Sequence, residues 1–202
     1  MRVKICGLGS VEQAVACVDA GADALGVNFV PSSARRTDIS TAKAIVQAVG
    51  DRALVVGVIA DLPVAQMRAL VRETGVGCLQ LHGQESAADV AALLPHAYKA
   101  VAVATAADVT LAAAYPGEYL MVDAKVPGRL GGTGRRIDGA LVVALARARR
   151  LVLAGGLTPE NVADAITEVR PWCVDAASGV ESSVGVKDIA KVKAFILAAR
   201  GA

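Results

Sequence analysis

The stretch LVLAGGLTPEN at residues 151–161 is a short apolar run that ends in two glycines and continues into a helical pattern. Thr158 stands where the N-cap of a helix would be, and Pro159 stands at the first helical position. Because Gly155 and Gly156 have no side chains, a ligand can approach their backbone N–H groups closely. The stretch therefore predicts the end of a strand, a tight loop that can bind an anion, and a helix that begins near residue 159.

A second stretch, WCVDAASGVE at 172–181, repeats this pattern, with Ser178 and Gly179 placed ahead of a possible short helix. Two successive strand ends with such loops are typical of the phosphate site after strands seven and eight of a (β/α)8 barrel. Ordinary strand-to-helix turns also contain glycine, so one loop alone would leave both interpretations open. Two in succession favour a phosphate site that both loops share.

Along the whole chain, short β-branched runs alternate with alanine-rich stretches of helical periodicity. The expected strands cover 3–6, 24–29, 53–59, 78–81, 98–103, 119–123, 151–154 and 173–175. The expected helices cover 11–20, 41–49, 64–73, 87–94, 106–114, 139–147, 159–169 and 187–199. Each helix supplies the crossover that parallel strands need, so the order predicts an α/β fold, a single-domain (β/α)8 TIM barrel over residues 1–202. A doubly wound open sheet is the second possibility, but no GxGxxG dinucleotide motif follows the first strand.

Composition narrows the class of protein. A chain that is 54% hydrophobic but only 3% aromatic suits strands that are covered on both faces. The net charge of +2, without a run of like charges, argues against nucleic acid or an anionic membrane as a partner. The strand pattern begins at Arg2, and no uncharged segment reaches the roughly 20 residues of a membrane span, so we expect a soluble cytoplasmic protein without a secretory leader. The four cysteines have neither disulfide nor zinc spacing. As for partners, we expect the chain to be a monomer or a homodimer.

Side-chain alternation along the expected strands separates an apolar set from a polar set. The polar set near the carboxyl ends of the strands comprises Cys6, Asn28, Gln80, His82, Asp123 and Asp175. A barrel places its chemistry at these strand ends, so the set is expected to surround one pocket. Lys4 lies on the same face as Cys6, and a nearby ammonium would favour the reactive thiolate, although a strand cysteine is most often a small buried hydrophobe. Asp123 is a candidate acid or a loop cap, and His82 and Asp175 have structural alternatives of the same kind.

Two of the expected loops are longer and more polar than the others. Residues 31–40 contain Arg35 and Arg36, whose guanidinium groups could bind a carboxylate or a phosphate, or could form a solvated basic turn. Residues 124–137 contain four glycines and four cationic residues. This loop could be a mobile lid over an anionic substrate or an ordinary flexible surface loop.

In order along nearly the whole chain, several motifs resemble those of the phosphoribosylanthranilate isomerase family of tryptophan biosynthesis. They are VKICGL at 3–8, GADALG at 21–26, QLHG at 80–83, VDAK at 122–125, GGTG at 131–134, LAGGLTPENV at 153–162, VDAASGVE at 174–181 and VKDIAKVKAFI at 186–196. The resemblance implies a (β/α)8 barrel that converts N-(5-phosphoribosyl)anthranilate, a small phosphosugar-anthranilate substrate, to the isomeric 1-deoxyribulose 5-phosphate. It also implies that neither a metal nor an organic cofactor is needed.

The resemblance also implies roles for particular residues. Cys6 would be the general base, Asp123 the general acid, and Arg35 the residue that holds the anthranilate carboxylate. The phosphate would rest on Gly155, Gly156, Ser178 and Gly179. Position at the strand ends, and not the resemblance, makes Gln80, His82 and Asp175 further substrate-binding candidates. The chain departs from the family pattern at Ala177, where a serine is usual. The neighbouring Arg36 is the alternative to Arg35 for binding the carboxylate.

Two other functions remain open at this point. Another phosphosugar enzyme on the same barrel, such as an epimerase or a synthase, would share the phosphate loops. It would not need a thiol and a carboxyl group together with an arginine for an aromatic carboxylate. A non-catalytic phosphate-binding protein would bind the ligand without turnover.

Overall fold

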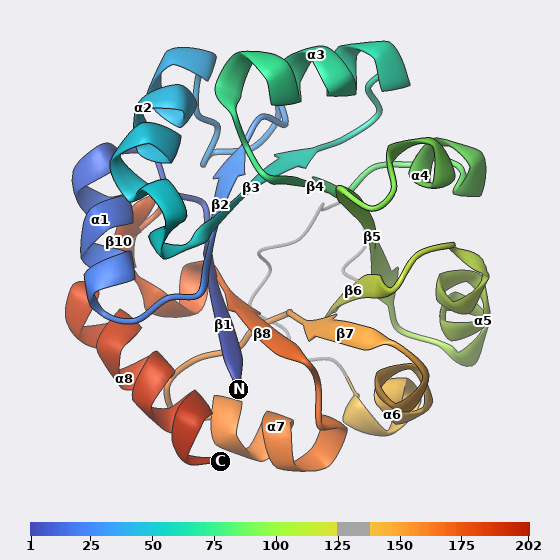
Figure 1. Ribbon diagram of the computed structural model, residues 1–202. Helices are drawn as coiled ribbons and strands as arrows, with labels where there is room; N and C mark the ends of the chain where they lie inside the picture. The colour runs from blue at the N-terminus through green and yellow to red at the C-terminus, as the bar shows by residue number, and fades with distance from the viewer. Residues whose placement is uncertain (125–137) are drawn as a thin grey trace.

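Eight parallel strands form a closed barrel in a computed structural model that describes residues 1–124 and 138–202. The strands are β1 (Arg2–Cys6), β2 (Ala24–Asn28), β3 (Leu54–Ile59), β4 (Cys78–Leu81), β5 (Ala97–Val103), β6 (Tyr119–Ala124), β7 (Arg150–Leu153) and β8 (Cys173–Ala176). The helices are α1 (Val11–Asp19), α2 (Ile39–Val49), α3 (Val64–Thr74), α4 (Ala87–Leu93), α5 (Ala106–Ala114), α6 (Gly139–Ala148), α7 (Val162–Val169) and α8 (Ile189–Gly201). Figure 1 shows these helices as a ring around the strands.

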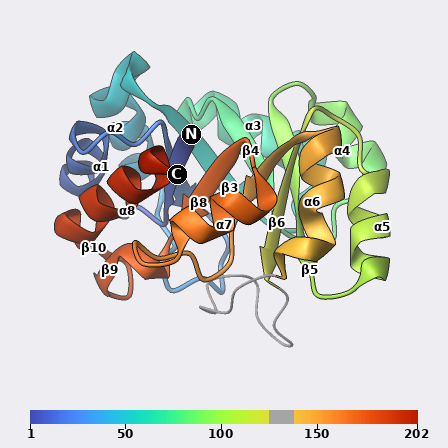
Figure 2. The same ribbon diagram turned by 90° about the horizontal axis from the view of Figure 1, so that it is seen from below.

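The barrel closes because the last strand pairs with the first. β8 runs parallel to β1, with Arg2 opposite Cys173 and Ile5 opposite Ala176. A doubly wound open sheet leaves two free edges, so this pairing confirms the predicted (β/α)8 barrel and excludes the alternative. The N- and C-termini lie close together in both views (Figures 1 and 2).

Apolar side chains form two layers on opposite faces of the strands. Val3, Ile5 and Leu25 are fully buried in the outer layer, between the strands and the helices. The inside of the barrel is filled by a second cluster that includes Tyr98 and Met121. Alternation along the strands therefore sorts the faces as the sequence predicted, and the polar residues of β1 face the interior.

The start of α7 corrects the sequence prediction. The helix begins at Val162, with Asn161 at the N-cap, and not at residue 159 behind a Thr158 cap. The Asn161 side chain accepts a hydrogen bond from the Thr158 N–H and donates one to the Gly156 carbonyl, both at 2.9 Å. These two bonds hold residues 156–161 in a turn, so the helix cannot start before the turn is complete.

A small antiparallel hairpin that the sequence did not predict follows β8. The 3₁₀ helix η2 (Ser178–Val180) leads into β9 (Glu181–Ser183), which pairs with β10 (Val186–Lys187). Another 3₁₀ helix, η1 (Gly50–Arg52), extends α2. In Figure 2 the hairpin lies at the end of the barrel away from the N-terminus, the end where the strands finish. Among residues 1–124 and 138–202, no helix combines the length and apolar character needed to cross a bilayer.

Candidate active site

Cys6 is the last residue of β1 and lies inside the mouth of the barrel. Its side chain is buried and packs in a small cluster with Val30 and Val58. Gly26 is its register partner on β2, and a Cβ atom built at Gly26 would lie 2.5 Å from the Cys6 Sγ. Glycine at this position therefore makes the space that the sulfur occupies.

Opposing effects act on the pKa of the Cys6 thiol. Burial raises the pKa most strongly, because a thiolate loses its hydration. The Lys4 ammonium lowers the pKa, the Asp175 carboxylate raises it, and Lys187 lowers it, with a net upward shift. The thiol form therefore predominates at neutral pH in the free protein, and the thiolate fraction grows as the pH rises.

Beneath Cys6, an ion pair crosses from β1 to β8 inside the barrel. The Lys4 Nζ donates to the Asp175 Oδ1 at 3.0 Å, and both side chains are buried. Burial alone would lower the pKa of Lys4, but the adjacent carboxylate outweighs it and holds this pKa well above its ordinary value. The Lys4 side chain is therefore protonated at neutral pH, and it lies two residues before Cys6 on the same face of β1.

Asp123 lies near the end of β6, and its side chain is buried. Met121, two residues earlier, belongs to the cluster inside the barrel, so alternation directs Asp123 to the interior as well. In the closed order of strands, only β7 and β8 separate β6 from β1. The predicted lid at 124–137 falls almost wholly on residues 125–137, outside the residues that the structure describes.

Arg35 lies in the loop between β2 and α2, beside the first turn after Cys6. A Cβ atom at Gly7 would come within 2.6 Å of the Arg35 Cδ, so the arginine stem lies across this glycine. The Nε and Nη2 atoms of the guanidinium each donate to the Glu181 carboxylate at 2.7 Å. These bonds to Glu181 raise the pKa of Arg35.

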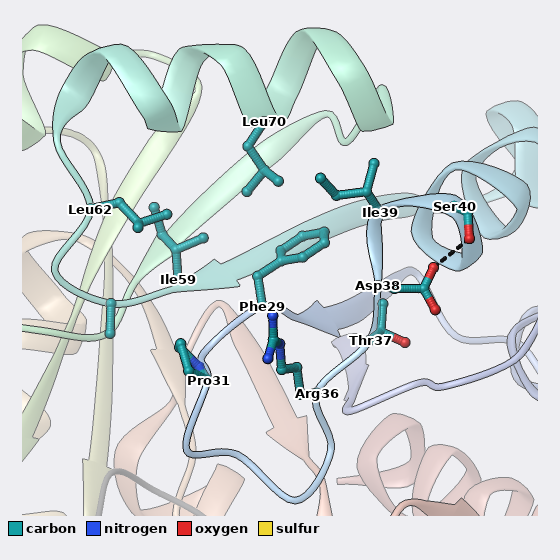
Figure 3. A pocket seen from close by; sticks show the side chains of 11 residues that line it. Phe29, Pro31, Arg36, Thr37, Asp38, Ile39, Ser40, Ile59, Leu62 and Leu70 are labelled. Atoms are coloured by element: carbon teal, nitrogen blue, oxygen red, sulfur yellow. Dashed lines mark hydrogen bonds between the residues drawn. The ribbon is translucent and has the colours of Figure 1, made fainter.

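Arg36 lines a cavity of about 570 Å³ on the outer side of the strands (Figure 3). The cavity lies between the loop after β2, the end of β3, and the helices α2 and α3. Its apolar lining includes Phe29, Ile59 and Leu70. The two neighbouring arginines therefore face different surroundings, and Arg35 is the one beside Cys6.

The two loops predicted to bind phosphate touch each other. Gly155 and Gly156 have φ angles of +95° and +62°, which a residue with a side chain rarely adopts. Within the described residues, their N–H groups donate no hydrogen bond, so both are available to an anion. Gly179 packs so closely on the Leu157 carbonyl that a Cβ atom there would collide with it. The loops after β7 and β8 therefore form one surface, with Ser178 in the same turn.

The other polar residues of the interior are joined by hydrogen bonds. The Tyr98 hydroxyl donates to the Gln80 Oε1 at 3.0 Å, and the Gln80 Nε2 lies 3.1 Å from the His82 Nδ1. Burial, with the nearby Lys99 and Lys4, lowers the pKa of His82 to about 4, so the ring is neutral at pH 7. Substrate binding by Gln80, His82 and Asp175 stays a prediction. Among the described residues, no cluster of His, Cys, Asp and Glu could hold a metal ion.

Two charged residues of the β9–β10 hairpin have contacts that their sequence motifs do not predict. The Glu181 carboxylate accepts two hydrogen bonds from the Arg35 guanidinium, an arrangement called here the Arg35 fork. The Lys187 Nζ donates to the same carboxylate at 2.7 Å. No local pattern marks either residue, because Glu181 and Arg35 are 146 positions apart in the chain. Each of the two residues follows a valine, Val180 or Val186, but a single apolar neighbour does not predict burial.

Comparison with known proteins agrees with this geometry. The family model described as N-(5'phosphoribosyl)anthranilate (PRA) isomerase matches residues 3–198. The N-(5'-phosphoribosyl)anthranilate isomerase of Roseiflexus castenholzii is 43% identical over 212 residues, covering 100% of this chain and 99% of the relative. The structure of phosphoribosyl anthranilate isomerase from Thermotoga maritima, an enzyme described as dimeric, has a TM-score of 0.93 and 35% identity, with both chains fully covered.

A further solved structure, of the isomerase in complex with reduced 1-(o-carboxyphenylamino)-1-deoxyribulose 5-phosphate, has a TM-score of 0.89 and 33% identity, and both chains are again fully covered. The resemblance inferred from the sequence motifs is confirmed by the match of the family model over nearly the whole chain. The chain belongs to the phosphoribosylanthranilate isomerase family, the enzymes that convert N-(5-phosphoribosyl)anthranilate to 1-(2-carboxyphenylamino)-1-deoxyribulose 5-phosphate in tryptophan biosynthesis.

Proposed function

We propose that Cys6 is the general base and Asp123 the general acid of this isomerisation. One observation carries the proposal: β7 and β8, which lie between β6 and β1 in the barrel, lead into the two glycine-bearing loops. A substrate whose phosphate rests on those loops would have Asp123 on one side and Cys6 on the other. The proposed phosphate-binding residues are Gly155, Gly156, Ser178 and Gly179.

The reaction needs one proton delivered and another removed. Protonated Asp123 gives its proton to the ribose ring oxygen, and the C1–O bond breaks to leave an open-chain Schiff base. The Cys6 thiolate then takes the proton from C2, which gives an enolamine. Tautomerisation of the enolamine forms the C2 ketone, so atoms balance without an oxidant. One positioned acid or base contributes about 100- to 10,000-fold to such a rate.

Arg35 is proposed to bind the anthranilate carboxylate. Two of its nitrogens already bond to Glu181, and the Nη1 has no hydrogen-bond partner among the described residues. The side chain lies across Gly7, next to the proposed base. Arg36 faces the outer cavity instead, which supports Arg35 as the carboxylate-binding residue of the pair.

The proposal is tested by the turnover of N-(5-phosphoribosyl)anthranilate without added metal. We expect Cys6→Ser and Asp123→Asn each to lower kcat by about 100- to 10,000-fold, because each removes one proton-transfer group. Cys78→Ser is the matched control, since this half-buried thiol lies at the start of β4. Turnover at the normal rate by either active-site variant would remove that residue from the mechanism. Rescue of a tryptophan auxotroph that lacks only this step tests the activity in a cell.

The proposed ligand is this phosphosugar-anthranilate substrate. The proposed location is the cytoplasm, because a doubly anionic phosphate ester made there does not cross a membrane unaided. The only protein partner proposed is a second copy of the chain, by analogy with the dimeric relative from Thermotoga maritima. Light scattering after size-exclusion chromatography distinguishes monomer from homodimer.

A further inference from the structure

A buried carboxylate in the β9–β10 hairpin uses both oxygens to hold two cations. The Glu181 Oε1 accepts from the Arg35 Nε and from the Lys187 Nζ, each at 2.7 Å. The Oε2 accepts from the Arg35 Nη2, also at 2.7 Å. The side chains of Lys187, Glu181 and Arg35 are 0%, 5% and 17% exposed, so only the arginine reaches the open mouth.

The Glu181 carboxylate carries its charge at neutral pH, although it is buried. Burial pushes the pKa of Glu181 upward, but its bonds to Arg35 and Lys187 outweigh burial and hold this pKa below its ordinary value. By formal charge, Arg35, Lys187 and Glu181 sum to +1, which suits an anionic ligand. The fork also fixes the plane of the guanidinium, because two parallel bonds to one carboxylate allow a single orientation.

Lys187 connects this cluster to the phosphate loop. Besides its bond to Glu181, the Nζ donates to the Ala177 carbonyl at 3.2 Å, one residue before Ser178. The Lys187 backbone N–H donates to the Gln13 Oε1 at 2.8 Å, which anchors the hairpin to α1. One buried ammonium therefore joins the loop after β8 to the residue that holds Arg35.

We propose that Glu181 and Lys187 are positioning residues that set the two ends of the substrate site relative to each other. Glu181 orients Arg35 before the substrate arrives, so less side-chain entropy is lost on binding the aromatic carboxylate. Lys187 holds the phosphate loop at a defined distance from that arginine. The inference deepens the proposed function and rests on it, since it assumes that Arg35 receives the anthranilate carboxylate.

The test compares two substrates, N-(5-phosphoribosyl)anthranilate and the aniline analogue, which lacks only the carboxylate. For Glu181→Gln we expect the KM for the anthranilate substrate to rise about tenfold with kcat within about threefold, because binding common to ground and transition states is lost. The aniline analogue should have the same kcat/KM in both proteins. A general disturbance of the fold would lower kcat/KM for both substrates equally, and that result would overturn the inference.

Further variants separate failure of the inference from failure of the proposed function. Arg35→Ala should lose its preference for the anthranilate substrate; if it does not, the proposed role of Arg35 fails. If Arg35→Ala behaves as expected but Glu181→Gln keeps the preference, only the positioning role is overturned. Glu181→Asp, which keeps the charge on a shorter side chain, gives a second measurement if the glutamine variant does not fold. Glu118→Gln is the control, because it removes an exposed carboxylate at the far end of β6.

The link to the phosphate loop has its own measurement, which is competitive inhibition by inorganic phosphate. Lys187→Met leaves the Arg35 fork in place but frees the Ala177 carbonyl. We expect its inhibition constant for phosphate to rise about fivefold, with the preference between the two substrates unchanged. An unchanged inhibition constant would show that Lys187 does not position the loop.

Discussion

Gly26→Ala places one methyl group where the proposed catalytic sulfur lies. The new Cβ atom would be 2.5 Å from the Cys6 Sγ and 3.1 Å from the Cys6 Cα. Non-bonded heavy atoms prefer separations of about 3.5–4.0 Å, so the sulfur has to move by about 1 Å. The Cys6 backbone cannot move as far, because β1 is paired with strands on both sides.

A displacement of this size has a calculable cost in rate. A misplacement of about 1 Å typically lowers a catalytic rate about 100-fold, which corresponds to about 2.7 kcal/mol in the activation free energy. Extra volume in a packed interior also destabilises a fold by about 1–3 kcal/mol. We therefore expect Gly26→Ala to fold, with a lower free energy of unfolding and a kcat about 100-fold below that of the parent.

The assay is kcat for N-(5-phosphoribosyl)anthranilate, measured together with urea unfolding. Gly57→Ala is the matched control, because Gly57 is on the next strand but faces the outer layer, where a Cβ would meet Leu79 and Phe29 side chains at 3.2 Å. It should lower stability and leave kcat unchanged. If Gly26→Ala folds and keeps the parent kcat, the position of the Cys6 sulfur does not limit the reaction.

Two further predictions concern buried charges. Lys187→Met removes a cation that lowers the pKa of the Cys6 thiol, so the rise of kcat/KM with pH should move to higher pH; a shift to lower pH would contradict the electrostatic account. Glu85→Gln breaks the buried ion pair with Lys99, whose Nζ lies 3.1 Å from the Glu85 Oε2. We expect the free energy of unfolding, measured by urea titration, to fall by about 3–5 kcal/mol. A loss below about 1 kcal/mol would show that the pair is dispensable.

The elements of the barrel could be predicted because their patterns are local. Most strands are short apolar runs, and their period of two separates an inner face from an outer face once helices cover the outside. Lys99 of β5 is an exception among the polar residues, because it shares the outer face with Val101 and pairs with Glu85. The start of α7 could not be predicted in the same way. Both Thr158 and Asn161 are suitable N-cap residues, and the choice depends on the bond from the Asn161 amide to the Gly156 carbonyl.

The candidate site could be predicted only in part. Cys6 and Asp123 stand at strand ends, and the position of strand ends follows from the fold. The partner of Arg35 follows from no local rule, because Glu181 reaches it from a hairpin inserted after η2. A sequence pattern can place an arginine at a barrel mouth, but the direction of its guanidinium depends on which distant carboxylate receives it.

Closure of the barrel explains why these distant residues form one site. Because β8 pairs with β1, the loop that follows β8 lies beside the loop that follows β1 and next to Arg35. The same neighbourhood imposes close contacts, and glycine occupies the positions where a side chain would collide: Gly7 under the Arg35 stem and Gly179 against the Leu157 carbonyl. These glycines permit successive loops to approach each other closely, which the proposed binding of one small substrate by all of them requires. A side chain added at Gly179 should therefore separate the two phosphate loops and weaken phosphate binding, even though it leaves the proposed acid and base in place.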